Sequence, residues 1–265
     1  MLLEFDYTAM ITFVLWLMGL VFFYFAESKR IQTAGLYILI AGIGLFTAYI
    51  ANLWVFLDRA PLRTLGETRL WYTFFLSVLG VVFYIRWKYK WLIGYSFFMA
   101  ILFMVINYFS PENFSKTLMP ALQSYWFVPH VIVYILAYAV LAVSAIIGLK
   151  GLWALRQNTE TESVSVTADN VVYMGFSLLT FGLLFGALWA KEAWGHYWTW
   201  DPKETWAFIT WLFYLIYIHL RLHFSKKPAL AFWILALAFV ALLICWFGVN
   251  YLPSAANSVH TYTNA

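Results

Sequence analysis

Long apolar runs, separated by short polar connections, make up most of this chain. Eight of the runs approach the roughly 20 residues that a helix needs to cross a bilayer core of about 30 Å. They cover residues 7–26, 35–57, 69–86, 91–109, 127–149, 171–190, 205–224 and 229–249. Because backbone polar groups in lipid must be paired within their own segment, each run is predicted to be a transmembrane α-helix.

The composition of the chain agrees with a membrane protein. Apolar residues form 64% of its 265 residues and charged residues 11%, whereas soluble domains contain about 45–50% and about 25%. A water-soluble core cannot bury this excess of apolar residues, but lipid can cover it. The predicted fold class is therefore all-α, a polytopic integral membrane helix bundle of about eight transmembrane helices that forms one membrane domain, 1–265.

Lysine and arginine in the connections indicate the orientation of the bundle. One set of connections holds Lys29, Arg30, Arg86, Lys88, Lys90, Lys150, Arg156, Arg221, Lys226 and Lys227, and the opposite set holds Arg59, Arg63, Arg69, Lys116, Lys191 and Lys203. The more basic set is expected in the cytoplasm, which places both termini on the external side. The net charge of +4 then reflects orientation, and no nucleic acid partner is expected. The largest cytoplasmic connection, about 156–170, is polar and predicted to be flexible.

The five histidines are distributed unevenly over the predicted bundle. His130 opens the fifth span on the external side, and His260 lies in the external tail. His196 falls between the sixth and seventh spans, and His219 and His223 lie near the inner end of the seventh. His219 is about 20 Å from the outer end of that span. A titratable residue at such depth is a functional candidate, the alternative being a histidine hydrogen-bonded between helices.

A tryptophan-rich segment, WGHYWTWDPKETW, occupies residues 194–206. Tryptophan commonly collects at the membrane interface, and this tendency explains the outermost rings of the segment. It does not explain the acidic residues within it. Asp201 or Thr199 could cap the seventh helix, with Pro202 in its first turn. Capping in turn leaves the number of tryptophans unexplained.

Topology places His130, the tryptophan segment and His260 on the same side of the membrane. Neutral imidazole is a common axial ligand of haem iron, and a flat macrocycle needs apolar walls, so the three features together predict a haem site. Taken singly, His130 reads as an interfacial residue and His260 as a residue of an unstructured tail. The single cysteine, Cys245, leaves no Cys-x-x-Cys pair with which the chain could bind haem covalently to itself.

Three stretches of the sequence resemble the cytochrome c assembly family, the haem-handling proteins with a WWD domain. They are MPALQSYWFVPHV at 119–131, the tryptophan segment at 194–206, and IYIHLR at 216–221. The WDPKE ending of the segment is similar to the CcsA (ResC) branch of the system II pathway. The resemblance is thin before Leu70, so residues 1–110 are the less family-like helices and residues 111–265 the haem-handling core.

The resemblance implies roles for particular residues. His130 and His260 would be external axial ligands of the haem iron, and His219 a ligand of a transmembrane haem. The segment residues expected to cradle haem are Trp194, Trp198, Trp200, Asp201 and Trp206. The transported substrate would be haem b with reduced iron. The cations available to the haem propionates are the external Arg59, Arg63, Arg69, Lys116, Lys191 and Lys203, the alternative being that these charges only solvate their loops.

The resemblance also implies partners and an activity. The chain offers one intramembrane histidine of the required kind, so CcsB (ResB) would supply the second. An apocytochrome c with a Cys-x-x-Cys-His segment would receive the haem. With CcsB the chain would deliver haem across the membrane and attach it covalently, as a holocytochrome c synthase of the haem lyase type. The host membrane would be a bacterial inner membrane or a thylakoid, with attachment on the external face.

Two alternatives remain open from the sequence. A CcmC-like haem exporter or chaperone would pass haem on without forming thioether bonds. A b-type haem electron-transfer subunit would also bind haem among its helices, although it would normally carry histidine pairs on facing spans, which this chain lacks.

Overall fold

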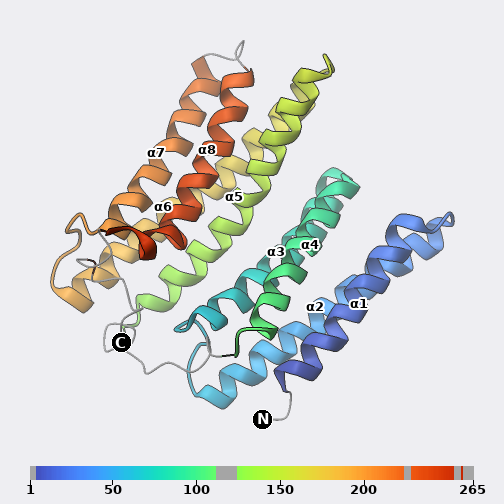
Figure 1. The fold of residues 1–265 in the computed structure, drawn as a ribbon, viewed down its shortest axis with the longest axis horizontal. Coiled ribbons are helices and arrows are strands. Elements are labelled where there is room, and N and C mark those ends of the chain that lie inside the picture. The colour runs from blue at the N-terminus through green and yellow to red at the C-terminus, as the bar shows by residue number, and fades with distance from the viewer. Residues whose placement is uncertain (1–3, 112–123, 224–227, 254–257, 259–265) are drawn as a thin grey trace. The chain divides into compact units, whose positions relative to one another are not determined.

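The computed structural model of the chain describes residues 4–111, 124–223, 228–253 and 258 (Figure 1). Within these residues the secondary structure is helical, without strands, and eight helices are long and apolar enough to cross a membrane. They are α1 (Phe5–Phe25), α2 (Lys29–Leu57), α3 (Leu65–Trp87), α4 (Lys90–Tyr108), α5 (Phe127–Arg156), α6 (Glu162–Trp194), α7 (Pro202–His223) and α8 (Pro228–Trp246), followed by a short 3-10 turn, η3 (Gly248–Tyr251). The predicted all-α integral membrane fold is confirmed.

The connection between α5 and α6 is shorter than predicted. The flexible stretch expected at 156–170 is wrong for most of its length, because α6 already begins at Glu162. The first turns of α6 are polar, but they bury Ser165, Thr167 and Ala168. These turns also carry half-buried Asp169, which pairs with a basic residue of α7 described below. Hydropathy detects only the apolar part of a helix, so the polar extension was missed.

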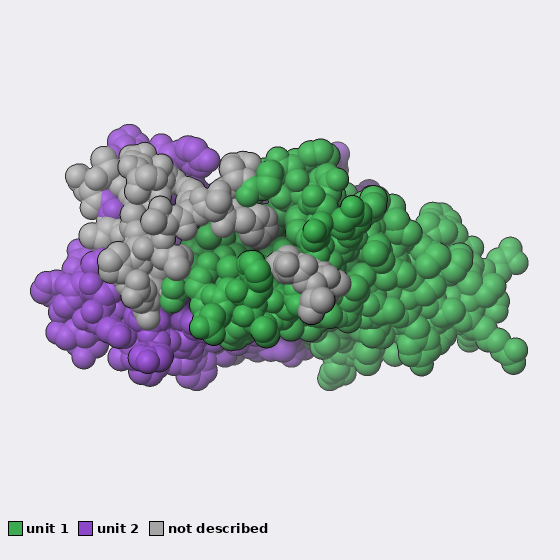
Figure 2. All heavy atoms as spheres, turned by 90° about the horizontal axis from the view of Figure 1, so that it is seen from below, with its two compact units in different colours: residues 1–119 green, residues 120–265 purple. Residues whose placement is uncertain are grey.

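The chain divides into two compact units, residues 1–119 and residues 120–265, coloured separately in Figure 2. In unit 1, α1 packs along α2 and α3 along α4. The backbones of α1 and α2 approach closely, since a Cβ atom at Gly35 would lie 2.6 Å from the backbone nitrogen of Phe23. Trp16 fills the interior of the unit, fully buried against Phe46 and Phe97.

Unit 2 is a ring of four helices in which α5 packs on α6 and α8, and α7 packs on α8 and α6. Helix α5 is the most buried of the eight spans. Of its apolar 18-residue stretch, 67% is buried inside the protein. Successive helices run in opposite directions, so one end of the unit gathers the start of α5, the end of α6, the start of α7 and the end of α8 (Figure 1). This end carries the tryptophan segment.

Candidate functional site

His130 lies in the first turn of α5, held against α6. Its Nδ1 atom is 2.9 Å from the carbonyl oxygen of Gly182. A carbonyl can only accept, so Nδ1 carries the proton and the lone pair of the neutral ring is on Nε2. The ring stacks on Trp189 at 5.3 Å between centroids, with an interplanar angle of 26°, and Tyr134 is 4.7 Å away. The imidazole is thereby fixed in tautomer and orientation, as a metal-binding histidine requires.

Glycines of α6 make this close packing feasible. A Cβ atom at Gly186 would lie 2.8 Å from Cε1 of His130, and one at Gly182 would lie 2.2 Å from Cδ2 of Tyr134. Any larger residue at position 186 therefore has to displace the imidazole.

Trp189 is central to the His130 side of the site, although no pattern in the sequence distinguishes it. Its ring contacts His130, Phe127 at 5.3 Å and Trp194 at 4.8 Å, and the residue is buried. Within the apolar sixth run, Trp189 resembled any other aromatic residue facing lipid or the core. Only the packing of α5 on α6 distinguishes it.

The tryptophan segment leaves α6 through Gly195, whose φ of 85° lies in the left-handed region that glycine adopts without strain. Trp200 is also left-handed, with φ 60°, which is uncommon for a residue with a side chain. Trp200 contacts Trp198 at 5.7 Å and Phe208 at 5.8 Å, both edge to face. It is 63% exposed, so this aromatic surface is available to a ligand.

The two acidic residues of the segment both cap the start of α7. Asp201 Oδ1 accepts from the backbone nitrogen of Lys203 at 2.9 Å. Glu204 Oε2 accepts from the nitrogen of Asp201 at 3.1 Å and from that of Thr199 at 2.8 Å. The predicted capping of α7 by Asp201, with Pro202 in the first turn, is confirmed. Glu204 in addition fixes the backbone on both sides of Trp200.

Asp201 has a second partner, from the C-terminal tail. The hydroxyl of Ser258 donates to Asp201 Oδ1 at 2.9 Å. The same carboxylate therefore caps α7 and binds the tail. His260 itself lies outside the described residues, two positions after Ser258.

The predicted residues thus fall into two described groups at this end of unit 2. One contains His130, with Trp189 and Trp194, at the α5 and α6 ends. The other contains Trp198, Trp200 and Asp201 at the start of α7. Trp206 lies half-buried in the second turn of α7.

His219 lies near the other end of α7 and is exposed. Its Nδ1 is 2.9 Å from the carbonyl oxygen of Leu215, one turn earlier, so Nε2 bears the lone pair here too. His223 follows one turn later, with 6.4 Å between the ring centroids. His219 thus faces outward from unit 2, where lipid or another protein would meet it.

An ion pair joins α6 to α7 beside His219. Arg221 Nη2 lies 2.9 Å from Asp169 Oδ2, and its Nε donates to Oδ1 at 2.9 Å. The hydroxyl of Tyr217 donates to the same Oδ1 at 2.7 Å. This network fixes the rotation of α7 and hence the direction in which His219 points.

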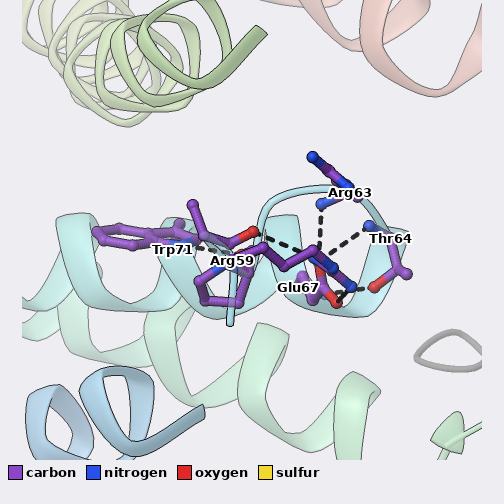
Figure 3. Close-up of polar contacts among 7 residues, drawn as sticks. Arg59, Arg63, Thr64, Glu67 and Trp71 are labelled. Atoms are coloured by element: carbon purple, nitrogen blue, oxygen red, sulfur yellow. Dashed lines mark hydrogen bonds and ion pairs between the residues drawn. The ribbon is translucent and has the colours of Figure 1, made fainter. Parts of the chain in front are cut away.

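Arg59 and Arg63, in the connection between α2 and α3 of unit 1, have mostly structural contacts (Figure 3). Arg59 makes two hydrogen bonds to Glu67, at 3.0 and 2.8 Å, and Glu67 also caps α3 with Thr64. Arg63 donates to Glu67 through its backbone nitrogen at 2.7 Å, and its side chain extends away from that carboxylate (Figure 3). Partial burial and the nearby Arg59 lower the pKa of Arg63.

Comparison with known proteins gives consistent results over nearly the whole chain. The model of a family described as "Cytochrome C assembly protein" matches residues 4–256. A protein of Nymphaea alba named "Cytochrome c biogenesis protein CcsA" is 31% identical over 260 residues, which cover 82% of each chain. A protein of Guillardia theta with the same name is 30% identical over 294 aligned positions, covering 96% of each chain.

Proposed function

This chain belongs to the cytochrome c assembly protein family and handles haem in cytochrome c maturation, and from that premise we propose that it holds haem at the α5–α6–α7 end of unit 2 for covalent attachment to an apocytochrome c. The observation that carries the proposal is the fixed imidazole of His130, stacked on Trp189, with its Nδ1 proton bound to Gly182. Haem is the substrate here, not a resident cofactor.

His130 is the first proposed axial ligand of the haem iron. Hydrogen bonding of Nδ1 leaves Nε2 as the coordinating atom and raises its basicity. The ring cannot rotate freely, because Trp189 covers one face and Gly186 offers space only for the present position. Such an arrangement reduces the conformational cost of binding the iron.

His260 is the second proposed ligand. The hydrogen bond from Ser258 to Asp201 ties the tail to the start of α7. His260 follows Ser258 by two positions, and two residues of extended chain span at most about 7 Å, which supports a ligand role for His260 at the tryptophan segment. Asp201 would then act as a positioning residue that determines where the second ligand can reach.

The tryptophans are proposed to supply the walls of the haem site. Trp200 is exposed, and its backbone is fixed by Glu204 through the nitrogen atoms of Thr199 and Asp201. Trp198 packs against its edge. Because these apolar side chains do not need to reorganise, they favour the binding of a flat macrocycle over contact with water. Trp194 and Trp206 would extend this surface.

A second haem position is proposed at His219. An exposed histidine on a membrane-spanning helix is costly in lipid unless another group binds it. Because His219 faces outward, the second ligand of a haem there would come from another protein, for which CcsB (ResB) is the proposed source. The Asp169–Arg221 pair keeps that face of α7 directed outward.

In the proposed reaction each cysteine thiol of the Cys-x-x-Cys-His segment adds across one haem vinyl group. The sulfur bonds to the vinyl carbon next to the ring and the thiol hydrogen goes to the terminal carbon, so no oxidant or reductant is consumed. The chain contributes position, since holding the reacting groups together gains several kcal/mol over free encounter. Haem b with reduced iron, and an external location, are part of the proposal.

The test purifies the protein with its CcsB partner and compares the haem content and absorption spectrum of His130→Ala, His260→Ala and His219→Ala. His196→Ala and His223→Ala are matched controls, because they remove exposed histidines that have no proposed ligand role. Loss of the spectrum in the first set alone supports the proposal. Unchanged spectra in both His130→Ala and His260→Ala refute the external site.

Attachment is tested separately, by co-expression with CcsB and an apocytochrome c in a host that lacks its own assembly system. Covalent haem on the acceptor supports synthase activity. Release of free haem without covalent product supports an exporter instead.

A further inference from the structure

A cavity of about 240 Å³ lies in unit 1, at the end where α1 gives way to α2, whereas the histidines and tryptophans proposed to bind haem belong to unit 2. Three helices line it, through Phe23 of α1, Lys29, Gln32, Thr33 and Leu36 of α2, and Tyr84 of α3. The lining is amphipathic, with apolar and aromatic walls and a polar rim. Among these described lining residues there is no carboxylate; Glu27, the nearest in sequence, is exposed in the α1–α2 turn.

Three lysines lie in the cavity lining or next to it. Lys29 is part of its lining. The ammonium group of Lys90 donates to Gln32 Oε1 at 3.1 Å and lies 5.5 Å from the ring centroid of Phe23. Lys88 lies 5.5 Å from the ring centroid of Tyr84. Lys29 thus lines the cavity, while Lys88 and Lys90 each lie beside a lining residue, so the surroundings of the cavity are positively charged.

The polar part of the cavity is held in a fixed shape. Gln32 accepts from Lys90 and donates through Nε2 to the carbonyl oxygen of Ala26 at 2.8 Å, which joins the α1–α2 turn to α4. Helices α2 and α4 both begin here, and neither Ser28 nor Tyr89 forms a side-chain cap. The positive ends of two helix dipoles thus add to the three ammonium groups.

The position of the cavity along the helices indicates that an anion bound there would come from a lipid headgroup. All four helices of unit 1 are long and apolar enough to cross the membrane, so their ends lie at the depth of the lipid headgroups. Thr33, Leu36 and Ile40 share one face of α2, at spacings of three and four residues, and Ile40 is 40% exposed. That face leads from the polar rim toward the depth of the acyl chains.

We propose that this cavity binds the headgroup phosphate of an acidic phospholipid, with Lys29, Lys88 and Lys90 around the phosphate and an acyl chain along Leu36 and Ile40. We propose a lipid with a net negative charge because the ammonium or choline group of a zwitterionic headgroup would be repelled by the three lysines. Basic pockets between membrane helices bind acidic headgroups in this manner.

The experiment measures the thermal midpoint of the purified full chain in detergent during titration with phosphatidylglycerol, phosphatidylcholine or inorganic phosphate. Phosphatidylglycerol is expected to raise the midpoint at low molar ratio, and the other two are not. In the variant Lys29→Gln/Lys90→Gln, the apparent affinity for phosphatidylglycerol should fall by about fivefold per lysine. Lys150→Gln/Arg156→Gln on α5 is the matched control and should bind like the wild type.

Lys29→Gln alone is a second variant, because Lys29 is exposed and its loss leaves the Lys90–Gln32 hydrogen bond intact. Its midpoint without lipid reports whether folding is preserved. Equal responses to phosphatidylglycerol and phosphatidylcholine would overturn the proposal, as would wild-type affinity in both lysine variants. A full response to inorganic phosphate alone would also overturn it, since the site would then recognise free phosphate.

Discussion

Gly186 of α6 provides the space in which the His130 ring of α5 lies, since a Cβ atom at Gly186 would be 2.8 Å from Cε1 and 2.9 Å from Nδ1. The contact involves the outer part of a side chain, which can swing away, and not the backbone. Gly186→Ala is therefore expected to move the imidazole while the helices stay packed. Its hydrogen bond to Gly182 would be lost, and haem affinity should fall about tenfold or more.

The measurement is the haem content of purified Gly186→Ala, together with its thermal midpoint without haem. Gly44→Ala in α2 is the matched control, because a Cβ atom there meets nothing within 4 Å. Equal haem content in Gly186→Ala and the wild type contradicts a ligand role for His130 in its present orientation.

Ser258 is expected to matter for haem binding but little for folding. In Ser258→Ala, Asp201 keeps its bond to the Lys203 nitrogen, so the α7 cap survives. The lost hydrogen bond is worth about 1 kcal/mol, and haem retention should fall by about fivefold if the tail positions His260. Ser177→Ala removes an exposed hydroxyl that donates to the Tyr173 carbonyl within α6 and serves as control. A parallel loss of thermal stability and haem would instead indicate a structural role.

Glu204 is expected to hold the tryptophan segment in one conformation. Glu204→Ala removes the acceptor of the Thr199 and Asp201 nitrogens, at a cost of about 1–3 kcal/mol. The left-handed backbone of Trp200 would then relax. Hydrogen exchange measures this directly, and the amides of Thr199 and Asp201 should exchange faster. Glu160→Ala, at an exposed position, is the control. Unchanged exchange at both amides in Glu204→Ala would show that Glu204 does not hold this backbone in place.

The spans could be predicted from sequence because lipid imposes one simple requirement, an apolar run of sufficient length. The capping of α7 could also be predicted, since Asp201, Pro202 and Glu204 are local to the helix start. The polar start of α6 could not, because Asp169 is stabilised by a residue 52 positions away.

The site shows the same division between local and distant contacts. His130 stands out in sequence as a histidine at a helix start, and the tryptophan segment as a cluster. Trp189 and Gly186 acquire their roles only when α6 packs on α5. The link from Asp201 to Ser258 joins residues 57 positions apart, so no local pattern reveals it.

The Asp169–Arg221 pair is expected to stabilise the α6–α7 contact. The two side chains are 18% and 11% exposed, so Asp169→Asn should cost about 1–3 kcal/mol, between the values for surface and buried pairs. A double-mutant cycle with Arg221→Gln measures the coupling in thermal or denaturant unfolding. If the losses in unfolding free energy of the two single variants add up to that of the double variant, the pair contributes no coupling energy. The orientation of His219 would then have another origin.

Arg59 and Arg63 are expected to differ sharply in their effect on stability, although both lie in the connection between α2 and α3. Arg59→Ala breaks a two-bond contact with a 3% exposed Glu67 side chain and leaves that carboxylate without its counter-charge (Figure 3). The expected loss in the stability of unit 1 is about 3 kcal/mol. Arg63→Ala keeps the backbone hydrogen bond to Glu67, so its loss should stay below about 1 kcal/mol. Thermal unfolding of both variants measures this difference in stability, and the haem content of Arg63→Ala shows whether the Arg63 side chain binds the propionates. Equal destabilisation by the two variants would mean that Glu67 depends on the charge of the loop as a whole and not on the Arg59 contact.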